Sequence, residues 1–242
     1  MSNELVLANE KRELATLIEM NLGPDGKLSA NDITEVTMPK GGNTTFRIPT
    51  PEGDTNASEL EGIVVFKTKP RARYANAYSP GSKERPVCSS RNGDFGVPYD
   101  KETETYGNPI PCGQCPYAKW GKDEKTNKPI PPACGQHMEL LLMTDHELLP
   151  MKVRVAATSL GNMDTYFKGL LKRNQYFFEV RTRITAEEDE TKTGQTCTRL
   201  IPTKVTDLDE DQRLDAERLH LMMEKMMAFQ ASEDEDEVDA ED

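Results

Sequence analysis

The sequence lacks any apolar run long enough to cross a membrane. Its longest apolar runs, such as LLLM at 140–143, are four residues long, whereas a spanning helix needs about 20. The first residues, MSNELVLANEKRE, lack the basic-then-apolar order of a secretion signal. We therefore expect a cytoplasmic protein that contacts no membrane.

Histidine is scarce as well: the chain has three, and none precedes His137. The stretch PCGQC at 111–115 is half of the signature of zinc-dependent nucleobase deaminases, but the other half, H-x-E, must lie upstream. His146 and Glu147 lie downstream with a different spacing, and no paired-carboxylate motif is apparent. The sequence thus excludes a deaminase and predicts a protein that is not an enzyme.

What the chain does have is a cluster of cysteines. Cys112 and Cys115 are spaced as a chelating turn, and metal ligation is favoured over disulfides in a chain without an export signal. Zinc accepts four thiolates or three thiolates and one imidazole, so the fourth ligand could be Cys88 or His137. The alternative is a set of loop thiols without a metal. Four of the five cysteines fall within 47 residues: Cys88, Cys112, Cys115 and Cys134.

Charge is unevenly distributed along the chain. The net charge is −12, but the last eleven residues hold eight acids and no bases, and without them 34 acids face 30 bases. Bases concentrate at 63–86 and at 148–183. This pattern favours a globule with a basic face and an acidic tail, although scattered surface charge is the simpler interpretation. Such a tail could compete for the basic face, recruit replication or recombination proteins, or only raise solubility.

The order of predicted elements points to a five-stranded β-barrel of the OB-fold type. Strands are expected at 61–78, 138–143, 148–156, 175–185 and 195–205, with a helix at 158–173 between the third and fourth. This order is that of the OB-fold, which binds oligonucleotides. The expected divisions are an N-terminal helix and arm at 1–60, the OB-fold at 61–205 with a zinc insertion at 79–135, a helix at 206–230 and a disordered acidic tail at 231–242.

Nucleic-acid binding needs cations along a groove and aromatic side chains on which bases stack. Side chains alternate along a strand, so the stretch at 63–73 would place successive cations on one outward face. Tyr117 and Trp120 could instead pack over the cysteine loop. The candidate contacts are Lys67, Lys69, Arg71, Arg73, Tyr78, Tyr117, Trp120, Lys152, Arg154, Phe177, Arg181 and Arg183.

Three motifs resemble a family of bacteriophage proteins: CSSRNGDFGVP, then GNPIPCGQCPYAKWG, then PPACGQHMELLLMTDHELLPMKVRVAATSLGNMDTYFKGLLKR. The resemblance covers roughly residues 60–205. It implies an OB-fold with an inserted zinc element and a role as a single-stranded DNA-binding protein of phage replication or recombination, in the cytoplasm of the host. It also implies that Cys88, Cys112, Cys115 and Cys134 are the zinc ligands, because the family commonly has a basic residue at the position of His137.

A second function class stays open on the sequence alone. A protein-interaction adaptor could use the zinc loop and the acidic tail to dock a host or phage enzyme without strong nucleic-acid binding. The sequence does not distinguish DNA from RNA as the ligand, and a homo-oligomer is compatible with it.

Overall fold

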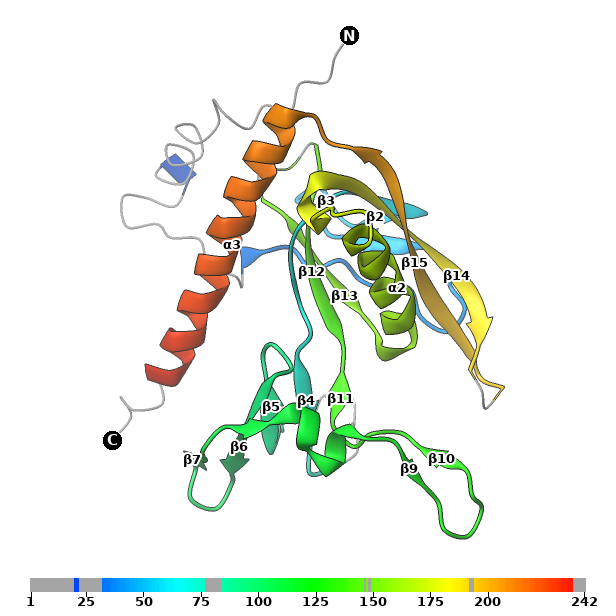
Figure 1. The fold of residues 1–242 in the computed structure, drawn as a ribbon, viewed down its shortest axis with the longest axis vertical. Coiled ribbons are helices and arrows are strands. Elements are labelled where there is room, and N and C mark those ends of the chain that lie inside the picture. The colour runs from blue at the N-terminus through cyan, green and yellow to red at the C-terminus, as the bar shows by residue number, and fades with distance from the viewer. Residues whose placement is uncertain are drawn as a thin grey trace. The chain divides into compact units, whose positions relative to one another are not determined.

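The computed structural model describes residues 20–21, 32–76, 84–145, 147, 149–191 and 194–236. The fold is mainly β, with antiparallel sheets and two helices, as predicted (Figure 1). Of the N-terminal helix and arm expected at 1–60, residues 1–19 and 22–31, which include nearly all of the helical pattern at 5–20, lie outside the described residues. The chain divides into two compact units: the sheet unit, residues 1–67, 140–154 and 161–242, and the cysteine-rich unit, residues 68–139 and 155–160.

The sheet unit is built on a five-stranded sheet of order β13-β12-β3-β14-β15. The central strands β3 and β12 each have four consecutive buried residues. The edge strand β13 alternates instead, with Met151, Val153 and Val155 buried between the more open Lys152 and Arg154. In the same unit, β1 and β2 form a separate antiparallel hairpin. The bounds are β1 Phe46–Ile48, β2 Thr55–Ala57, β3 Glu59–Thr68, β12 Met138–Met143, β13 Met151–Val155, β14 Val180–Glu190 and β15 Thr196–Asp207.

The described strands of this sheet do not close into a barrel, which corrects the expectation of a closed β-barrel. The edges are β13 and β15, and the N-terminal arm pairs with part of β13 and contacts a side chain of β15. The Val36 N–H donates to the Lys152 carbonyl (2.9 Å), and the Lys152 N–H donates to the Thr34 carbonyl (2.7 Å). On the other edge the Thr198 hydroxyl donates to the Asn43 carbonyl (2.9 Å). The backbone groups of Lys152 that would join β13 to another strand are therefore already used.

The two helices of the sheet unit cover opposite faces of its sheet. From α2, Leu160–Leu171, the Tyr166 hydroxyl lies 2.7 Å from the Thr182 hydroxyl on β14. From α3, Glu210–Asp236, Met223 packs with Ile63 of β3. Ile63 lies opposite Arg181 in the β3–β14 register, so the α3 face and the Thr182 face are different ones.

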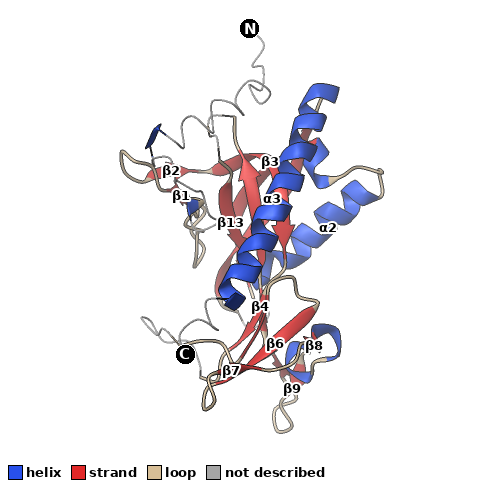
Figure 2. Cartoon of the chain, turned by 90° about the vertical axis from the view of Figure 1, so that its left-hand side faces the viewer, coloured by secondary structure: helices blue, strands red, loops and turns tan. Residues whose placement is uncertain are grey.

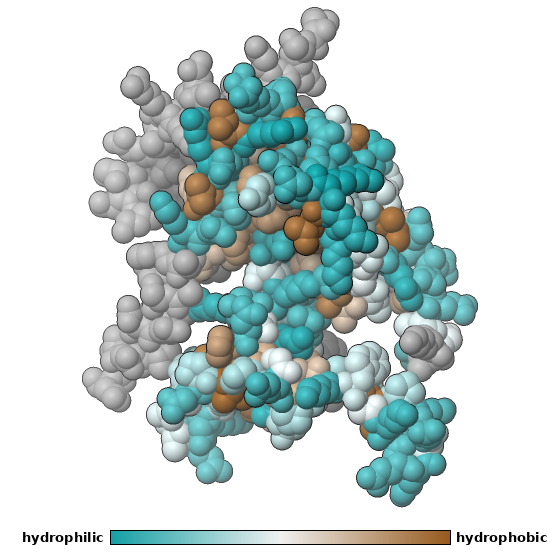
Figure 3. Space-filling view, viewed as in Figure 1, coloured by the Kyte–Doolittle hydropathy of each residue, from teal (hydrophilic) through white to brown (hydrophobic). Residues whose placement is uncertain are grey.

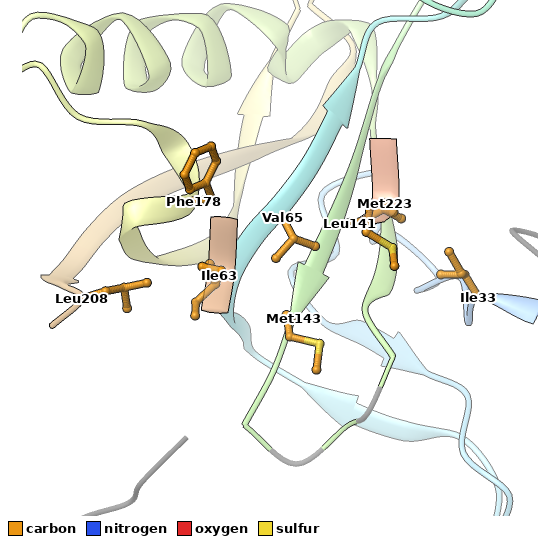
Figure 4. Close-up of a cluster of buried hydrophobic side chains, with 9 residues drawn as sticks. Ile33, Ile63, Val65, Leu141, Met143, Phe178, Leu208 and Met223 are labelled. Atoms are coloured by element: carbon orange, nitrogen blue, oxygen red, sulfur yellow. The ribbon is translucent and has the colours of Figure 1, made fainter. Parts of the chain in front are cut away.

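A buried apolar cluster holds α3 to the sheet (Figure 4). A polar anchor adds to it: Nδ1 of His220 lies 2.8 Å from the Val65 carbonyl oxygen, and the imidazole stacks on Phe178 with centroids 4.8 Å apart. The methionine stripe predicted for this helix therefore has a packing role at Met223. The cluster consists of Ile33, Ile63, Val65, Leu141, Met143, Phe178, Leu208, Ala216 and Met223.

The long strand expected at 61–78 is wrong, because the chain forms two strands there. β3 ends at Thr68, and β4, Arg71–Arg73, belongs to a different sheet. Pro70 lies between them, and a proline has no N–H with which to continue a ladder. Consequently Lys67, Lys69, Arg71 and Arg73 do not form one continuous row on one strand.

The cysteine-rich unit consists of short strands joined by loops (Figure 2). Its main sheet has the order β11-β4-β5-β6-β7, and β8 pairs with β6 beside this path. The bounds are β4 Arg71–Arg73, β5 Cys88–Ser90, β6 Phe95–Asp100, β7 Thr105–Tyr106, β8 Ile110–Pro111, β9 Gly121–Lys122, β10 Pro129–Ile130 and β11 Gly135–Gln136.

The C-terminal helix is longer than the sequence indicated. α3 ends at Asp236, inside the segment 231–242 for which a disordered tail was predicted, and residues 237–242 lie outside the described part. In the part of the chain that the structure describes, no helix combines the length and the apolar character that a membrane span requires.

Candidate metal centre and nucleic-acid interface

Four of the five cysteines lie in or beside short elements of the cysteine-rich unit. Cys88 begins β5, and Cys112 begins a 3-10 turn, Cys112–Gln114, that ends at Cys115. Within this turn the Cys115 N–H donates to the Cys112 carbonyl (3.2 Å). Because a 3-10 turn has about three residues, side chains three apart point the same way. The C-x-x-C spacing thus brings two thiols to one side.

Backbone hydrogen bonds join Cys112 and Cys134 to neighbouring segments of the unit. The Cys112 N–H donates to the Asp94 carbonyl (2.8 Å), and the Cys134 N–H donates to the Tyr117 carbonyl (2.8 Å). A side chain at Gly96 would lie 3.0 Å from Sγ of Cys88 and 3.3 Å from Sγ of Cys112. The backbone of β6 therefore passes directly against two sulfur atoms, and glycine leaves them the space.

The four thiols influence one another electrostatically. Burial raises the pKa of Cys88, and the nearby thiols of Cys134, Cys112 and Cys115 raise it further. Burial also raises the pKa of Cys134, while the guanidinium of Arg71 acts in the opposite direction. Thiols in such a cluster lose their protons most readily when a metal cation binds the sulfurs, because the thiolate is the form that ligates the metal.

The donor set fits zinc, which prefers soft thiolates in closed structural sites. The side chain of His137, the alternative fourth ligand, is engaged elsewhere: Nε2 lies 3.1 Å from Oε1 of Glu139. Within the described residues, no three His, Cys, Asp or Glu side chains already stand in a finished metal-binding arrangement. The thiols of Cys134, Cys112 and Cys115 all act on Cys88 electrostatically, so the four cysteines lie near one another. They would be the ligands of a bound zinc ion, whose role would be to crosslink loops, and this assignment stays a prediction.

Guanidinium groups of the cysteine-rich unit contact neutral partners. Cζ of Arg73 lies 4.2 Å from the centre of the Tyr117 ring, and Cζ of Arg85 lies 5.7 Å from that of Tyr99. Nη2 of Arg71 donates to Oε1 of Gln136 (3.0 Å). Among the described residues, none of these contacts is with a carboxylate, although Arg71 and Arg73 also act electrostatically on the thiol of Cys134 and Arg73 on that of Cys88. Arg85 was not among the predicted contacts, because nothing in the sequence spacing indicates that it meets Tyr99.

In the sheet unit, predicted cationic contacts are instead paired with acids. Nζ of Lys152 lies 3.1 Å from Glu35. Arg181 contacts Asp145 at 2.6 Å. Arg183 contacts Glu61 at 2.8 Å, and this hydrogen bond raises the pKa of the guanidinium. Much of the positive charge expected along this sheet is therefore neutralised within the unit.

The remaining predicted contacts of the sheet unit differ among themselves. Arg154 is exposed. Nζ of Lys67 lies 5.2 Å from the ring centres of both Phe167 and Phe177. Phe177 is half-buried and meets the ring of Phe178 edge-on, with centroids 5.4 Å apart, so it is a packing residue rather than an open platform.

The predicted aromatic contacts near the cysteines are open to solvent. Trp120 is 68% exposed and Tyr117 50%, so neither ring is buried against the cysteine loop. Tyr74, just after β4, is also half exposed. Tyr78 lies outside the described residues. Apolar side chains appear at the surface of the cysteine-rich unit near β5 (Figure 3).

Comparisons with known proteins returned no match: no family model, no curated protein and no solved structure resembles this chain closely enough to count. The resemblance to phage proteins therefore stays a prediction.

Proposed function

We propose that the chain is a single-stranded DNA-binding protein of phage replication or recombination, in which a zinc ion stiffens the cysteine-rich unit. The observation that carries the proposal is the pairing of guanidinium groups with aromatic rings on that unit, Arg73 with Tyr117 and Arg85 with Tyr99. Non-specific single-strand binding requires this combination, since cations attract phosphates and rings stack on bases. Trp120, with most of its surface exposed, is a further stacking residue.

The strand order of the sheet unit supports a relationship to the OB-fold. Numbered along the chain as β3, β12, β13, β14 and β15, the strands lie in the order 3-2-1-4-5, and α2 separates the third from the fourth. An OB-fold is a five-stranded barrel that is often partly open. We therefore interpret the sheet unit as an opened OB-fold and the cysteine-rich unit as an elaboration between its first two strands.

The proposal shifts the interface from the sheet to the cysteine-rich unit. Over their full residue ranges, that unit has 11 Lys and Arg against 8 Asp and Glu, whereas the sheet unit has 19 against 34. Four thiolates with one Zn²⁺ would add two negative charges to the first unit, which still leaves it slightly positive, so a polyanion is repelled far less by it than by the second unit. The acidic C-terminal segment is then the candidate contact for replication or recombination proteins in the host cytoplasm.

The test is a titration of the full chain into a fluorescently labelled oligothymidylate, followed by anisotropy at several salt concentrations. We expect binding that weakens as salt rises, because phosphate contacts release counterions. The same titration with an RNA of equal length decides between the two nucleic acids. An absence of binding at low salt, both for the full chain and for a chain ending at residue 231, contradicts the proposal.

A further inference from the structure

A hollow of about 270 Å³ opens on the cysteine-rich unit beside the cysteine cluster. Its walls are mostly apolar and include Ile110 and three prolines, Pro98, Pro111 and Pro116. Cys88 and Cys115 also line it, on the side of the cluster. Among the described residues that line the hollow, Arg73 alone carries a charge.

The polar groups of the hollow are few and suit a planar ligand. Arg73 and Tyr117 both line it, and they form the guanidinium–ring pair with its 4.2 Å separation. Tyr117 is half exposed. Gln114 adds an amide that both donates and accepts hydrogen bonds. Single-stranded nucleic acids are recognised in this way, since unstacked bases lie on aromatic rings or guanidinium planes while their edges are hydrogen-bonded.

A second hollow, of about 680 Å³, shares Arg73 and Pro98 with the first. Its lining is more polar and includes Tyr99, Lys101 and Thr105. Two carboxylates, Asp100 and Glu102, also line it, so the hollow as a whole suits a neutral sugar rather than a phosphate. Asp100 already accepts the backbone N–H groups of its own loop, from Glu102 (2.8 Å) and Thr103 (3.4 Å). Arg73 therefore stands between an apolar and a polar hollow, where a phosphate would lie between two nucleotides.

We propose that the apolar hollow binds a single unstacked nucleobase of a DNA strand, with Tyr117 and Arg73 as the stacking pair and Gln114 at the base edge. This inference rests on the proposed function and locates one nucleotide of the bound strand. The phosphate that follows the base contacts Arg73, and the next sugar enters the polar hollow.

The charge around the hollow favours a nucleotide over an apolar segment of a protein as its occupant. The hollow has a cation at its shared edge, and the unit around it has more bases than acids. A nucleotide presents an apolar flat face and an anion at the spacing of one sugar, which matches an apolar hollow with one guanidinium at its rim. A purely apolar peptide would leave that charge without a partner.

The experiment is photo-crosslinking of the wild-type chain to an oligothymidylate in which single thymines are replaced by 5-iodouracil. Tandem mass spectrometry then identifies the modified residue. We expect Tyr117, or a residue within 110–117, to carry the crosslink. An oligonucleotide that binds but crosslinks only elsewhere overturns this inference and leaves the proposed function intact. A chain that binds no oligonucleotide overturns both.

Affinity measurements add a second readout with a matched control. Tyr117→Leu removes the ring but keeps apolar bulk, so we expect about tenfold weaker binding of a short oligothymidylate, the typical cost of one lost stacking contact. Tyr176→Leu changes a tyrosine of the sheet unit that is 65% exposed, compared with 50% for Tyr117, and we expect no more than a twofold change. An oligonucleotide of abasic residues should bind Tyr117→Leu and wild type alike. Equal losses for both tyrosine variants would overturn the inference.

Discussion

The two units of this chain are stabilised in different ways. The sheet unit buries a long series of branched and aromatic side chains between α2, the sheet and α3. In the described part of the cysteine-rich unit, the buried hydrophobic residues are Cys112, Cys134, Met138 and Val155, and two of these are thiols. A unit with so small a core requires another source of stability, as small domains generally do.

The same contrast extends to charge. The sheet unit uses its arginines in ion pairs with its own acids, as Arg183 does with Glu61. The cysteine-rich unit pairs Arg73 and Arg85 with rings. A region that satisfies its charges internally is suited to being a scaffold, and a region whose cations face neutral groups is suited to binding an anion. Each of the following experiments changes a metal or a residue in one unit and tests whether the other unit, or a control variant, behaves differently.

Metal removal should have the largest effect, and it should be confined to one unit. Structural zinc contributes roughly 10–16 kcal/mol to small domains that depend on it. We expect a strong chelator, or Cys112→Ser, to abolish protection from hydrogen exchange across residues 88–136 while β14 and β15 stay protected. Hydrogen-exchange mass spectrometry measures both at once.

The control for metal removal is Cys197→Ser, which changes a cysteine of the sheet unit outside the cluster. We expect metal content and exchange to stay as in the wild type. If chelation left the exchange of residues 88–136 unchanged, the four cysteines would be loop thiols and the small core would suffice by itself.

Truncation of the apolar core should have the next largest effect, in the other unit. Leu141 is 1% exposed and belongs to the cluster beneath α3. Leu141→Ala should cost about 2–5 kcal/mol of unfolding free energy, because it removes buried methyl groups and leaves a cavity. Urea unfolding followed by far-UV circular dichroism measures this loss.

A matched control uses an exposed leucine of the same unit. Leu171 is 74% exposed, and Leu171→Ala should change stability by less than about 0.5 kcal/mol. Zinc content should be equal in both leucine variants. A loss of zinc on Leu141→Ala would mean that the two units fold together rather than by separate means.

Neutralising one cation of each unit should have a moderate effect on DNA binding in one case only. We expect Arg73→Gln to weaken oligothymidylate binding several-fold and to reduce the slope of log affinity against log salt by about 0.7, the value for one phosphate contact on a single strand. Arg183→Gln should stay within twofold, because Glu59 and Glu61 already neutralise this guanidinium. Anisotropy titrations measure both, and a larger loss for Arg183→Gln would return the interface to the sheet.

Local patterns in the sequence were sufficient for most elements of the sheet unit. The alternation around Lys152 and Arg154 predicted β13, and the apolar spacing that includes Met163 predicted α2. These elements depend on residues a few positions apart, so the spacing of apolar residues in the sequence is enough to predict them. The break at Pro70 was also visible as a bend, but its consequence, a second sheet, depends on the strands that β4 meets.

The candidate interface was harder to predict because charge pairing is not local. Arg183 and Glu61 are 122 residues apart and meet only through the β3–β14 register. A cation in the sequence therefore does not reveal whether the fold neutralises it. For the cysteines, the C-x-x-C spacing places two thiols close together locally, whereas the four-cysteine zinc site stays a prediction.

The smallest effect we predict concerns Asp207, an exposed carboxylate at the end of β15. Lys204 donates to it (2.6 Å), and Gln175 donates to the same oxygen. The hydrogen bond from Lys204, followed by that from Gln175, lowers the pKa of this carboxyl below its usual value.

A carboxyl whose pKa is lower in the folded state stabilises the fold above its unfolded pKa of about 3.9 and loses that contribution as the pH falls through its folded pKa. Asp207→Asn should therefore lower the urea midpoint slightly at pH 7, and the difference from wild type should shrink below about pH 4. The comparison is made by fluorescence or circular dichroism at both pH values. If the difference grew on acidification, the Lys204–Asp207 contact would not stabilise this edge of the sheet unit. The ion pairs elsewhere in the unit would then be its main charged contacts.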